Sequence, residues 1–343
     1  MQLFTHPDFD DHEEVVFARD AGAGLTAIIA VHNTALGPAL GGCRIWRYAS
    51  EDEAVADVLR LSRGMTYKAA LAGLALGGGK SVILADARTD KTPAMMRAMG
   101  RAVERLGGRY IVAEDVGATV ADMDEIARET AHVSGTSANV GDPSPWTARG
   151  VFLAMQAAAR HRWGSGVEGR TVSVTGLGNV GSNLCRQLAS AGARLVVSDI
   201  RGEAVRRVVQ ETGAAAIEPE AAHAADADVF APCALGAGLN ARTIPEIRAQ
   251  VVCGAANNQL ATLEDGERLA ARGILYAPDY LANAGGLVSV ARAKLGLDDR
   301  TAEAKVQAIP ETLVQVFRSA EQQGTHPAAA ADRLAESRFR AAA

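Results

Sequence analysis

The stretch TVSVTGLGNVGSNLCRQLASAGARLVVSD, Thr171 to Asp199, indicates the fold class of this 343-residue chain. A short apolar segment leads into the glycine-rich turn GLGNVG (176–181), and a helical segment then leads into a second apolar segment that ends at Asp199. Strand, glycine turn, helix and strand make up a βαβ unit, from which parallel sheets covered by helices are built. The chain is therefore predicted to contain a Rossmann-type α/β domain.

The same stretch predicts a dinucleotide site. Its glycines allow a tight turn and bring backbone N–H groups close to a pyrophosphate at the positive end of a helix. Asp199 would accept hydrogen bonds from the ribose hydroxyls and repel a 2′-phosphate, which favours NAD over NADP, although Arg201 keeps NADP open. The alternative is a glycine turn in a domain without a nucleotide. The predicted cofactor-binding residues are Gly176, Gly178, Asn179, Val180, Gly181 and Asp199.

Length and composition describe an ordinary globular protein of two domains, with 48% hydrophobic and 22% charged residues. The net charge is −5 and no basic cluster occurs, which argues against a nucleic-acid partner. The N-terminus has no apolar leader and no run of about 18 apolar residues occurs, so we expect a cytoplasmic protein without a membrane segment. The four cysteines are scattered without a CxxC pair, which favours reduced thiols over disulfides or a zinc site.

Lysine is scarce, because only five of the 35 basic residues are lysine, yet two of the five flank the run KAALAGLALGGGK (68–80). We expect Lys68 just past the end of a helix over residues 50–66, and Lys80 at the start of the strand SVILAD. The GGGKS segment is not a phosphate loop, because position 74 is leucine and the glycines lead into a strand rather than a helix. A lysine can act as a base after burial or beside another cation, whereas an arginine cannot. Lys80 is therefore a candidate base, and Asp115, at the end of the predicted strand RYIVAED, is a candidate partner.

Eight segments, in collinear order over nearly the whole chain, resemble the Glu/Leu/Phe/Val group of amino-acid dehydrogenases. They are GPALGGCR (37–44), GMTYKAA (64–70), LGGGKS (76–81), AEDVG (113–117), DPSPWTARGV (142–151), GLGNVG (176–181), GAANNQL (254–260) and YAPDYLANAGG (276–286). The resemblance implies an NAD-dependent, reversible oxidative deamination of an L-amino acid to a 2-oxo acid and ammonia. It also implies an N-terminal α/β substrate and oligomerisation domain and a C-terminal Rossmann NAD-binding domain, with a cleft between them.

The resemblance assigns roles residue by residue. Lys68 would bind the substrate carboxylate with the help of Asn258, while the backbone around Gly41 would line the substrate amino group. Lys80 would activate the water that attacks the iminium carbon, and Asp115 would move protons at the substrate nitrogen. The nicotinamide carboxamide would be held by Thr147 and Asn283.

The predicted side-chain pocket is apolar, because leucine stands at position 40, where the glutamate branch carries a lysine. Ala113 resembles the leucine branch and Leu287 the phenylalanine and tryptophan branches. Ordinary core packing is the alternative interpretation of both, and of Leu40 and Val290. The residues predicted to line the pocket are Leu40, Ala113, Leu287 and Val290. We expect a branched-chain aliphatic substrate, with phenylalanine or tryptophan as the alternative. A silent NAD-binding sensor remains an alternative of another class.

The domain limits predicted from the sequence are 1–138 for the substrate domain and 139–315 for the Rossmann domain. The helices over about 316–343 are expected to pack back on the first domain. A homo-oligomer, dimer or larger, is expected from the family.

Overall fold

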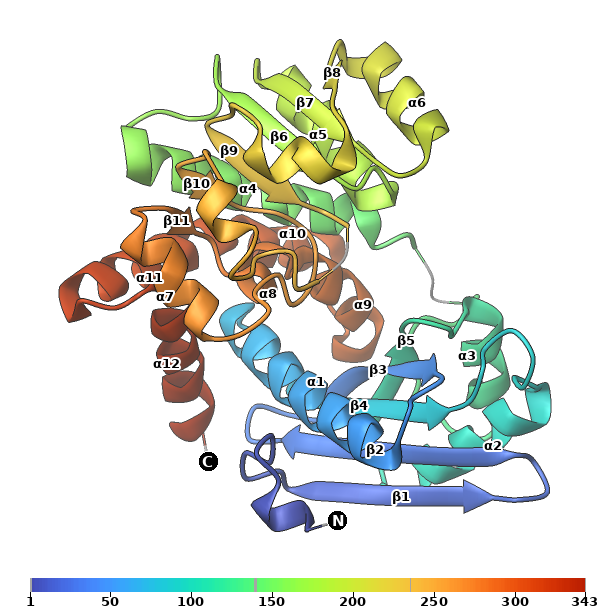
Figure 1. The fold of residues 1–343 in the computed structure, drawn as a ribbon. Coiled ribbons are helices and arrows are strands. Elements are labelled where there is room, and N and C mark those ends of the chain that lie inside the picture. Colours follow the sequence, from blue (N-terminus) through green and yellow to red (C-terminus); the bar gives the residue numbers. More distant parts are fainter. Residues whose placement is uncertain (1, 139–140, 235, 343) are drawn as a thin grey trace. The chain divides into compact units, whose positions relative to one another are not determined.

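The computed structural model describes residues 2–138, 141–234 and 236–342, which form two compact units (Figure 1). Unit 1 comprises Met1–Gly141, Val290–Leu297 and Ala335–Ala343, and unit 2 comprises Asp142–Ser289 and Asp298–Leu334. The domain limits predicted from the sequence stay a prediction, and residues 139 and 140 at that limit lie outside the described residues. Each unit is an α/β structure with its own sheet, so the predicted fold class is confirmed.

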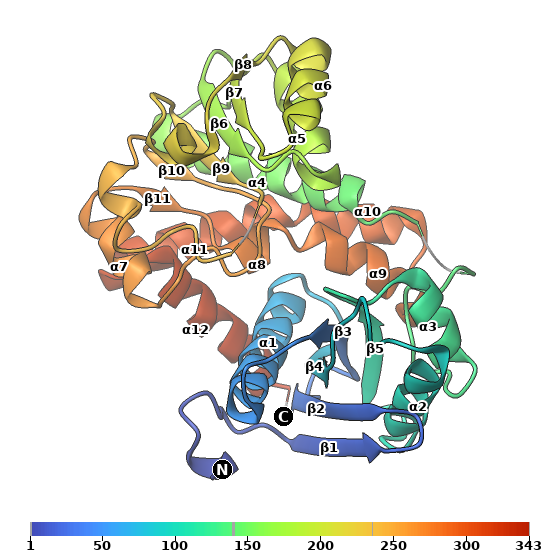
Figure 2. The ribbon, with the colours of Figure 1, turned by 45° about the vertical axis from the view of Figure 1, so that its right-hand side comes forward.

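Unit 1 is built on a five-stranded sheet in the order β1-β2-β4-β3-β5. The strands are β1 (Glu14–Asp20), β2 (Leu25–Asn33), β3 (Ala39–Trp46), β4 (Gly77–Leu84) and β5 (Tyr110–Glu114). Pairing is antiparallel from β1 to β2 and from β2 to β4, and parallel across β4, β3 and β5. Helix α1 (Glu51–Leu71) covers one face, and α2 (Pro93–Glu104) and α3 (Val120–Ala127) cover the other (Figure 2). Apolar side chains therefore form a core layer on each face of the sheet.

The glycine run before Lys80 forms part of strand β4, so the expectation that Lys80 begins the strand is wrong. A Cβ atom on Gly77 would overlap the carbonyl oxygen of Asn33, and one on Gly78 would overlap the backbone nitrogen of Thr66 in α1. A Cβ on Gly79 would lie 2.7 Å from the Tyr110 ring. Glycine is a poor strand former, but here it is the residue that allows the neighbouring backbones and the Tyr110 ring to approach so closely.

Helix α1 continues to Leu71, so Lys68 lies in its last turn and not beyond its end as expected. The Ser50 side chain caps the start of α1 by accepting from Glu53 N at 3.1 Å, and the Glu53 carboxylate accepts from Ala49 N. Thr66 and Lys68 both lie in this longer helix, and Thr66 is the residue of α1 whose backbone packs against Gly78 of β4.

Side chains also cap the first turns of α2 and α3 in unit 1. Thr92 caps α2, with Pro93 as its first residue, and Thr119 forms a capping box with Asp122 at the start of α3. Side chains that accept from the first free backbone N–H groups stabilise such ends, by about 1 kcal/mol each.

Unit 2 contains a parallel six-stranded sheet in the order β11-β10-β9-β6-β7-β8. Its strands are β6 (Thr171–Thr175), β7 (Arg194–Ser198), β8 (Ala215–Ala216), β9 (Val229–Pro232), β10 (Val251–Val252) and β11 (Leu275–Tyr276). Its helices are α4 (Ser144–Trp163), α5 (Asn179–Ser190), α6 (Gly202–Thr212), α7 (Glu264–Ala271), α8 (Asp279–Ala282), α10 (Asp299–Gln307) and α11 (Ile309–Gln323). Strands β6 and β7 pair in parallel, and α5 connects them along the chain, which confirms the predicted βαβ unit.

Two helices belong to both units by residue. Helix α9 (Gly285–Leu295) begins in the range of unit 2 and ends in that of unit 1, and α12 (Pro327–Arg340) does the same. Within unit 1, the end of α12 is attached to α1: Glu336 accepts from the Tyr67 hydroxyl at 2.9 Å, and Arg338 donates to the carbonyls of Ala70 and Leu71.

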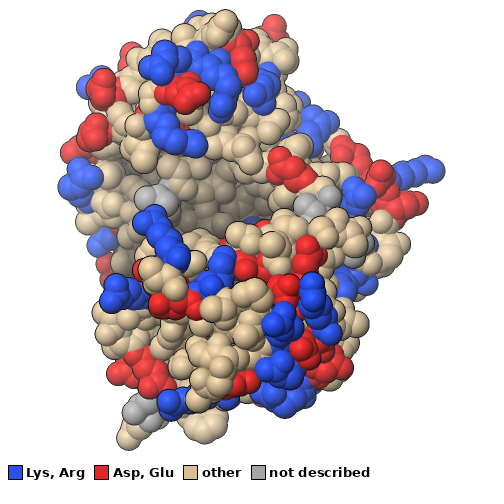
Figure 3. All heavy atoms as spheres, turned by 90° about the vertical axis from the view of Figure 1, so that its right-hand side faces the viewer, with Lys and Arg blue, Asp and Glu red and all other residues tan. Residues whose placement is uncertain are grey.

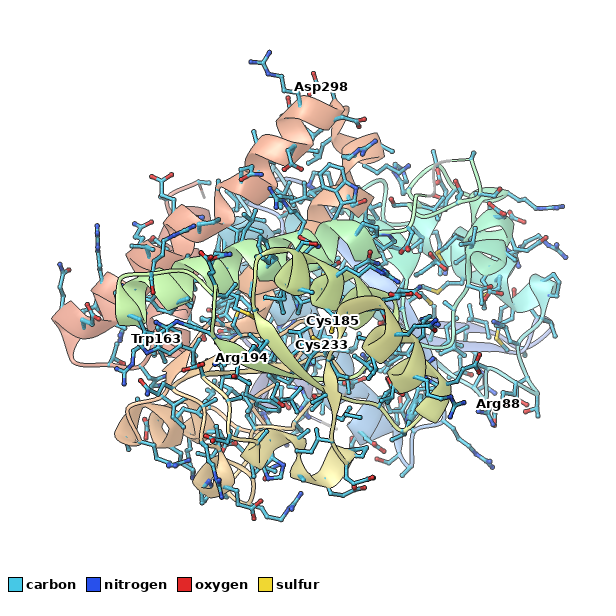
Figure 4. The ribbon with its side chains drawn as sticks, turned by 90° about the horizontal axis from the view of Figure 1, so that it is seen from above. Arg88, Trp163, Cys185, Arg194, Cys233 and Asp298 are labelled. Carbon is cyan, nitrogen blue, oxygen red and sulfur yellow. The ribbon has the colours of Figure 1, made fainter. Side chains whose placement is uncertain are left out.

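Basic and acidic side chains are interspersed on the face drawn in Figure 3. None of the helices in the described part of the chain combines the length and apolar character that crossing a membrane requires. Cys185 of α5 is buried in unit 2, and Cys233 of the same unit is half-buried (Figure 4). Burial raises the pKa of Cys233 and of Cys43 to about 12, so both thiols stay protonated at neutral pH.

Candidate active site

Three charged side chains meet at the end of β5 in unit 1. The Lys80 ammonium lies 2.6 Å from Asp115 Oδ2, and Arg44 Nε donates to the same oxygen at 3.2 Å. Lys80 comes from the middle of β4, Arg44 from β3, and Asp115 directly follows β5. The three strands are neighbours in the sheet, so parallel pairing brings together residues that are up to 71 positions apart.

The cluster is largely withdrawn from water. The Lys80 side chain is 8% exposed and that of Asp115 20%. Burial by itself raises the pKa of Asp115, but the nearby Lys80 and Arg44 outweigh it and hold the pKa below its ordinary value. Asp115 is therefore ionised at neutral pH and is paired with two cations.

A glycine provides the space for this contact. A Cβ on Gly42 would lie 2.7 Å from the Asp115 Cβ and 3.2 Å from the Lys80 ammonium. The sequence reasoning named Gly41 but neither Gly42 nor Arg44. The available signal was the segment GPALGGCR itself, in which a glycine and an arginine two residues apart face the same side of a strand.

Arg44 is anchored by the buried carboxylate of Asp57. Its Nη1 donates to Asp57 Oδ2 of α1 at 2.8 Å, and the Tyr48 hydroxyl donates to the same oxygen at 2.7 Å. Arg60, at the surface of α1, reaches the other oxygen of Asp57 at 3.4 Å. Arg44 thus connects the carboxylate at the end of β5 to helix α1, which carries Lys68.

The predicted pocket residues of unit 1 lie on the same sheet. Leu40 pairs with Gly78 and Ile111, and Gly42 pairs with Ala113, so strand alternation places Leu40, Ala113 and Lys80 on the face covered by α1. Leu40 and Ala113 are buried, while Lys68 in the last turn of α1 is half-buried. These residues are thus on one side of the sheet.

Gly41 points to the opposite side. A Cβ there would overlap the carbonyl oxygen of Gly79, and its own carbonyl accepts from the Tyr110 hydroxyl at 2.9 Å. Its predicted contact with the substrate amino group stays a prediction.

In unit 2 the three glycines of GLGNVG have three different environments. Gly176 has a φ of +89°, and a Cβ on Gly181 would overlap the carbonyl oxygen of Gly176. At Gly178, which precedes α5, no atom lies within 4 Å of an added Cβ. The first glycine thus makes the turn, the third allows helix and loop to pack, and the second leaves open space, which matches the known uses of these positions. Asn179 and Val180 form the first turn of α5.

Asp199 follows β7 and contacts this loop directly. Its Oδ2 accepts from Leu177 N at 2.6 Å, and its Oδ1 accepts from Arg201 N at 2.8 Å. The Arg201 guanidinium, whose side chain is 61% exposed, also binds this carboxylate at 3.1 Å. Burial raises the pKa of Asp199, but the hydrogen bonds from Arg201 and Leu177 outweigh it and lower the pKa overall. Arg201 is therefore a partner of Asp199 and not simply a solvated charge.

Thr147 and Asn283 come from neighbouring segments of unit 2. A Cβ on Gly286 would overlap Thr147 Oγ1, and Gly286 N donates to the Asn283 carbonyl at 3.4 Å. Asn283 is 2% exposed, and its Nδ2 donates to Ala255 O and to Asn257 Oδ1. Among the described residues its Oδ1 has no hydrogen-bond partner. A buried acceptor without a donor costs free energy, so this oxygen fits an amide N–H supplied by a ligand.

The remaining predicted residues are placed as follows. Asn258 is exposed in the segment GAANNQL, with a φ of +52°. Leu287 is buried in α9, and Val290 of the same helix is half-buried, with its carbonyl accepting from Ser134 Oγ at 2.9 Å. The roles assigned to these three residues stay predictions.

Comparison with known proteins matches this architecture to one family. Residues 12–132 match the model of the Glu/Leu/Phe/Val dehydrogenase dimerisation domain, and residues 140–218 and 199–342 match that of glutamate/leucine/phenylalanine/valine dehydrogenase. The chain is 50% identical to a leucine dehydrogenase of Geobacillus stearothermophilus, over 99% of this chain and 94% of that one. It is 48% identical to a valine dehydrogenase of Streptomyces coelicolor, over 99% and 95% of the two chains.

A solved structure agrees. The crystal structure of L-tryptophan dehydrogenase from Nostoc punctiforme is similar with a TM-score of 0.87, at 45% identity, over 97% of both chains. The resemblance inferred from eight sequence segments is thereby confirmed. With both units matched along almost their full length, this chain belongs to the Glu/Leu/Phe/Val dehydrogenase family.

Proposed function

We propose that this chain catalyses the NAD-dependent, reversible oxidative deamination of a branched-chain aliphatic L-amino acid. Amino acid, NAD⁺ and water give the 2-oxo acid, ammonium, NADH and a proton. The observation that carries the proposal is the 2.6 Å contact between Lys80 and Asp115 on a sheet face that Gly42 keeps open. It pairs a candidate base with a candidate proton carrier, within a chain about half identical to leucine dehydrogenases.

The chemistry assigned to unit 1 follows from this pair. Lys80, once it has passed a proton to solvent, accepts a proton from the water that attacks the iminium carbon. Asp115 takes up and returns protons at the substrate nitrogen, and Arg44 keeps it anionic between these steps. Lys68 is the proposed ligand of the substrate carboxylate in unit 1, and Asn258 is the one proposed in unit 2. An arginine at position 80 would keep the charge but not the base, because it does not lose its proton in this pH range.

The residues of unit 2 fit a nicotinamide dinucleotide. The open space beside Gly178 suits a pyrophosphate at the start of α5, and Asn283 Oδ1 offers an acceptor to the carboxamide, next to Thr147. NAD supplies a hydride acceptor when bound. Asp199 favours NAD over NADP, because its carboxylate repels a 2′-phosphate. Arg201 weakens that repulsion, which leaves some use of NADP as part of the proposal.

The proposed substrate is apolar and branched. Leucine and valine dehydrogenases are similar to this chain at 48–50% identity, and leucine at position 40 offers no charge to a side-chain carboxylate. Phenylalanine or tryptophan is the second candidate, since the tryptophan dehydrogenase is similar at 45% identity. One methylene more or less in such a pocket changes discrimination by only about 1–3 kcal/mol. We also propose that the chain forms a homo-oligomer, dimer or larger, through the domain matched by the dimerisation model.

The test is the formation of NADH, followed by absorbance at alkaline pH, with each L-amino acid of a panel. We expect rapid reduction of NAD with leucine, valine and isoleucine, slower reduction with phenylalanine and tryptophan, and none with glutamate. A faster rate with an aromatic substrate would replace the aliphatic assignment and keep the mechanism. No reduction with any amino acid, by protein that binds NADH, would overturn the dehydrogenase assignment and favour an NAD sensor.

A further inference from the structure

Asp279 is a buried acidic residue of unit 2 to which neither the proposed chemistry nor the cofactor site assigns a role. It begins helix α8 and is 6% exposed. Its Oδ1 accepts from the Tyr276 hydroxyl at 2.6 Å, and its Oδ2 accepts from the backbone nitrogen of Asn258 at 2.8 Å. A buried carboxyl group is costly unless it is well bonded, and both oxygens of Asp279 are bonded here.

The backbone that Asp279 holds has an uncommon conformation. Asn258 has a φ of +52°, in the left-handed region that few residues other than glycine adopt. Its carbonyl accepts from Ala237 N at 2.7 Å, and Ala237 itself has a φ of +57°. Both backbone polar groups of Asn258 are therefore fixed by residues outside its own segment, and so is the direction in which its Cβ leaves the chain.

Asp279 also contacts a residue of the proposed nicotinamide site. The backbone carbonyl of Asp279 accepts from Asn283 N at 2.8 Å. The Asn283 side chain in turn donates to Ala255 O and to Asn257 Oδ1, in the segment that contains Asn258. Three hydrogen bonds thus join the described segment Gly254–Leu260 to the segment Tyr276–Gly286, and the Asp279 carboxylate accepts the one made by Asn258.

From these contacts we infer that Asp279 is a positioning residue for the amino-acid substrate. Its carboxylate holds Asn258 in the left-handed conformation that presents the side-chain amide to the substrate carboxylate, next to the residue that binds the nicotinamide. The inference rests on the proposed function, in which Asn258 binds that carboxylate. A carboxylate suits this task because both its oxygens accept and neither donates, so one group can satisfy a hydroxyl and a backbone N–H.

The variant Asp279→Asn keeps the size of the side chain but has only one accepting oxygen for two donors. Small displacements of a positioning group cost up to about 100-fold in rate. We therefore expect kcat/KM for leucine to fall roughly 10- to 100-fold, with an increase in KM, while the Kd for NADH from fluorescence titration changes less than about twofold. Tyr276→Phe is the matched control, because it removes the donor to the other oxygen and leaves the bond to Asn258. Its loss should be much smaller.

A double-mutant cycle separates positioning from simple stability. Glycine at 258 adopts the left-handed conformation freely and has no amide to position. Added to Asn258→Gly, the change Asp279→Asn should cost about twofold or less in kcat/KM. Equal losses in the two backgrounds, or a loss of NADH affinity as large as the loss in kcat/KM, would overturn the inference. Wild-type protein inactive with every amino acid would instead overturn the proposed function.

Discussion

In unit 1 the charged side chains proposed for catalysis bind one another, whereas in unit 2 the groups proposed for the cofactor leave room and an acceptor open. Asp115 is bonded to Lys80 and Arg44, and Arg44 to Asp57. In unit 2 an added Cβ at Gly178 would contact nothing within 4 Å, and Asn283 Oδ1 has no partner among the described residues. A catalytic cluster must control proton affinity before the substrate arrives, while a binding site must keep part of its hydrogen-bonding capacity for the ligand.

The largest expected effect is on Lys80. Lys80→Ala removes the base of unit 1 and should reduce kcat by about 10³-fold or more, at the upper part of the range for acid–base groups. NADH affinity, a property of unit 2, should change by less than about twofold. Lys80→Arg is the informative companion, because it keeps the positive charge beside Asp115 and should be nearly as inactive. Substantial activity of the arginine variant in the NADH assay would show that charge, not proton transfer, is what position 80 supplies.

The second prediction compares glycines of the two units by thermal and chemical unfolding. Gly41→Ala places a Cβ against the carbonyl oxygen of Gly79 and should destabilise the protein by about 3 kcal/mol, near the upper end of overpacking costs. Gly178→Ala should change stability by less than about 0.5 kcal/mol. It should weaken NADH binding, because the methyl group occupies the open space beside the loop. Equal stabilities of the two variants would contradict the difference drawn between the units.

The third prediction concerns Asp199. Asp199→Ala should weaken NAD binding about 10-fold, since a hydrogen bond to a charged group contributes about 1.5–3 kcal/mol. It should also release Arg201 to meet a 2′-phosphate, so that the ratio of kcat/KM for NADP to that for NAD rises. The double change Asp199→Ala with Arg201→Ala is the control, and it should lose the gain with NADP. A ratio that stays constant in both variants would remove Asp199 from cofactor selection.

The smallest effect is expected on the pH profile. Because the pKa of Asp115 lies below its ordinary value of 3.8, its ion pairs stabilise the fold above that value and lose this contribution as the pH falls through the lowered pKa. Arg44→Gln removes one of the two cations, so the pKa of Asp115 should rise, and the acid limb of the stability profile, measured by unfolding at a series of pH values, should move to higher pH. We expect a shift of about one pH unit or less, because Lys80 remains.

A neighbouring arginine provides the control for that shift. Arg60 also pairs with Asp57, but its side chain is 64% exposed. In the described structure the ion pairs of Asp115 are with Arg44 and Lys80, not with Arg60. Arg60→Gln should leave the pH profile unchanged. Equal shifts in Arg44→Gln and Arg60→Gln would mean that the helix α1 carboxylate, and not the direct contact with Asp115, controls the profile.

Sequence reasoning was successful where the signal is local. The glycine turn, the helix after it and Asp199 lie within 29 residues, and each step depends on neighbouring φ angles, N–H groups or side-chain periodicity. The caps at Thr92 and Thr119 depend on equally local contacts, because each side chain accepts from a backbone N–H three residues later. Lys80 was placed wrongly at a strand start because glycines are read as breakers, and only the packing of Thr66 and Tyr110 against them explains why they lie within β4.

The residues of this chain therefore specify its family, its two α/β units and most of the residues of the candidate site, since each of these can be recognised from a short, local motif. Contacts made across long separations had to be seen in the fold. Arg44 reaches Asp115 over 71 positions, and Asp279 reaches Asn258 over 21. Strand order and loop packing create these contacts, and no single segment encodes them, because a side chain's partners and proton affinity are set by whatever the tertiary structure places within a few ångströms.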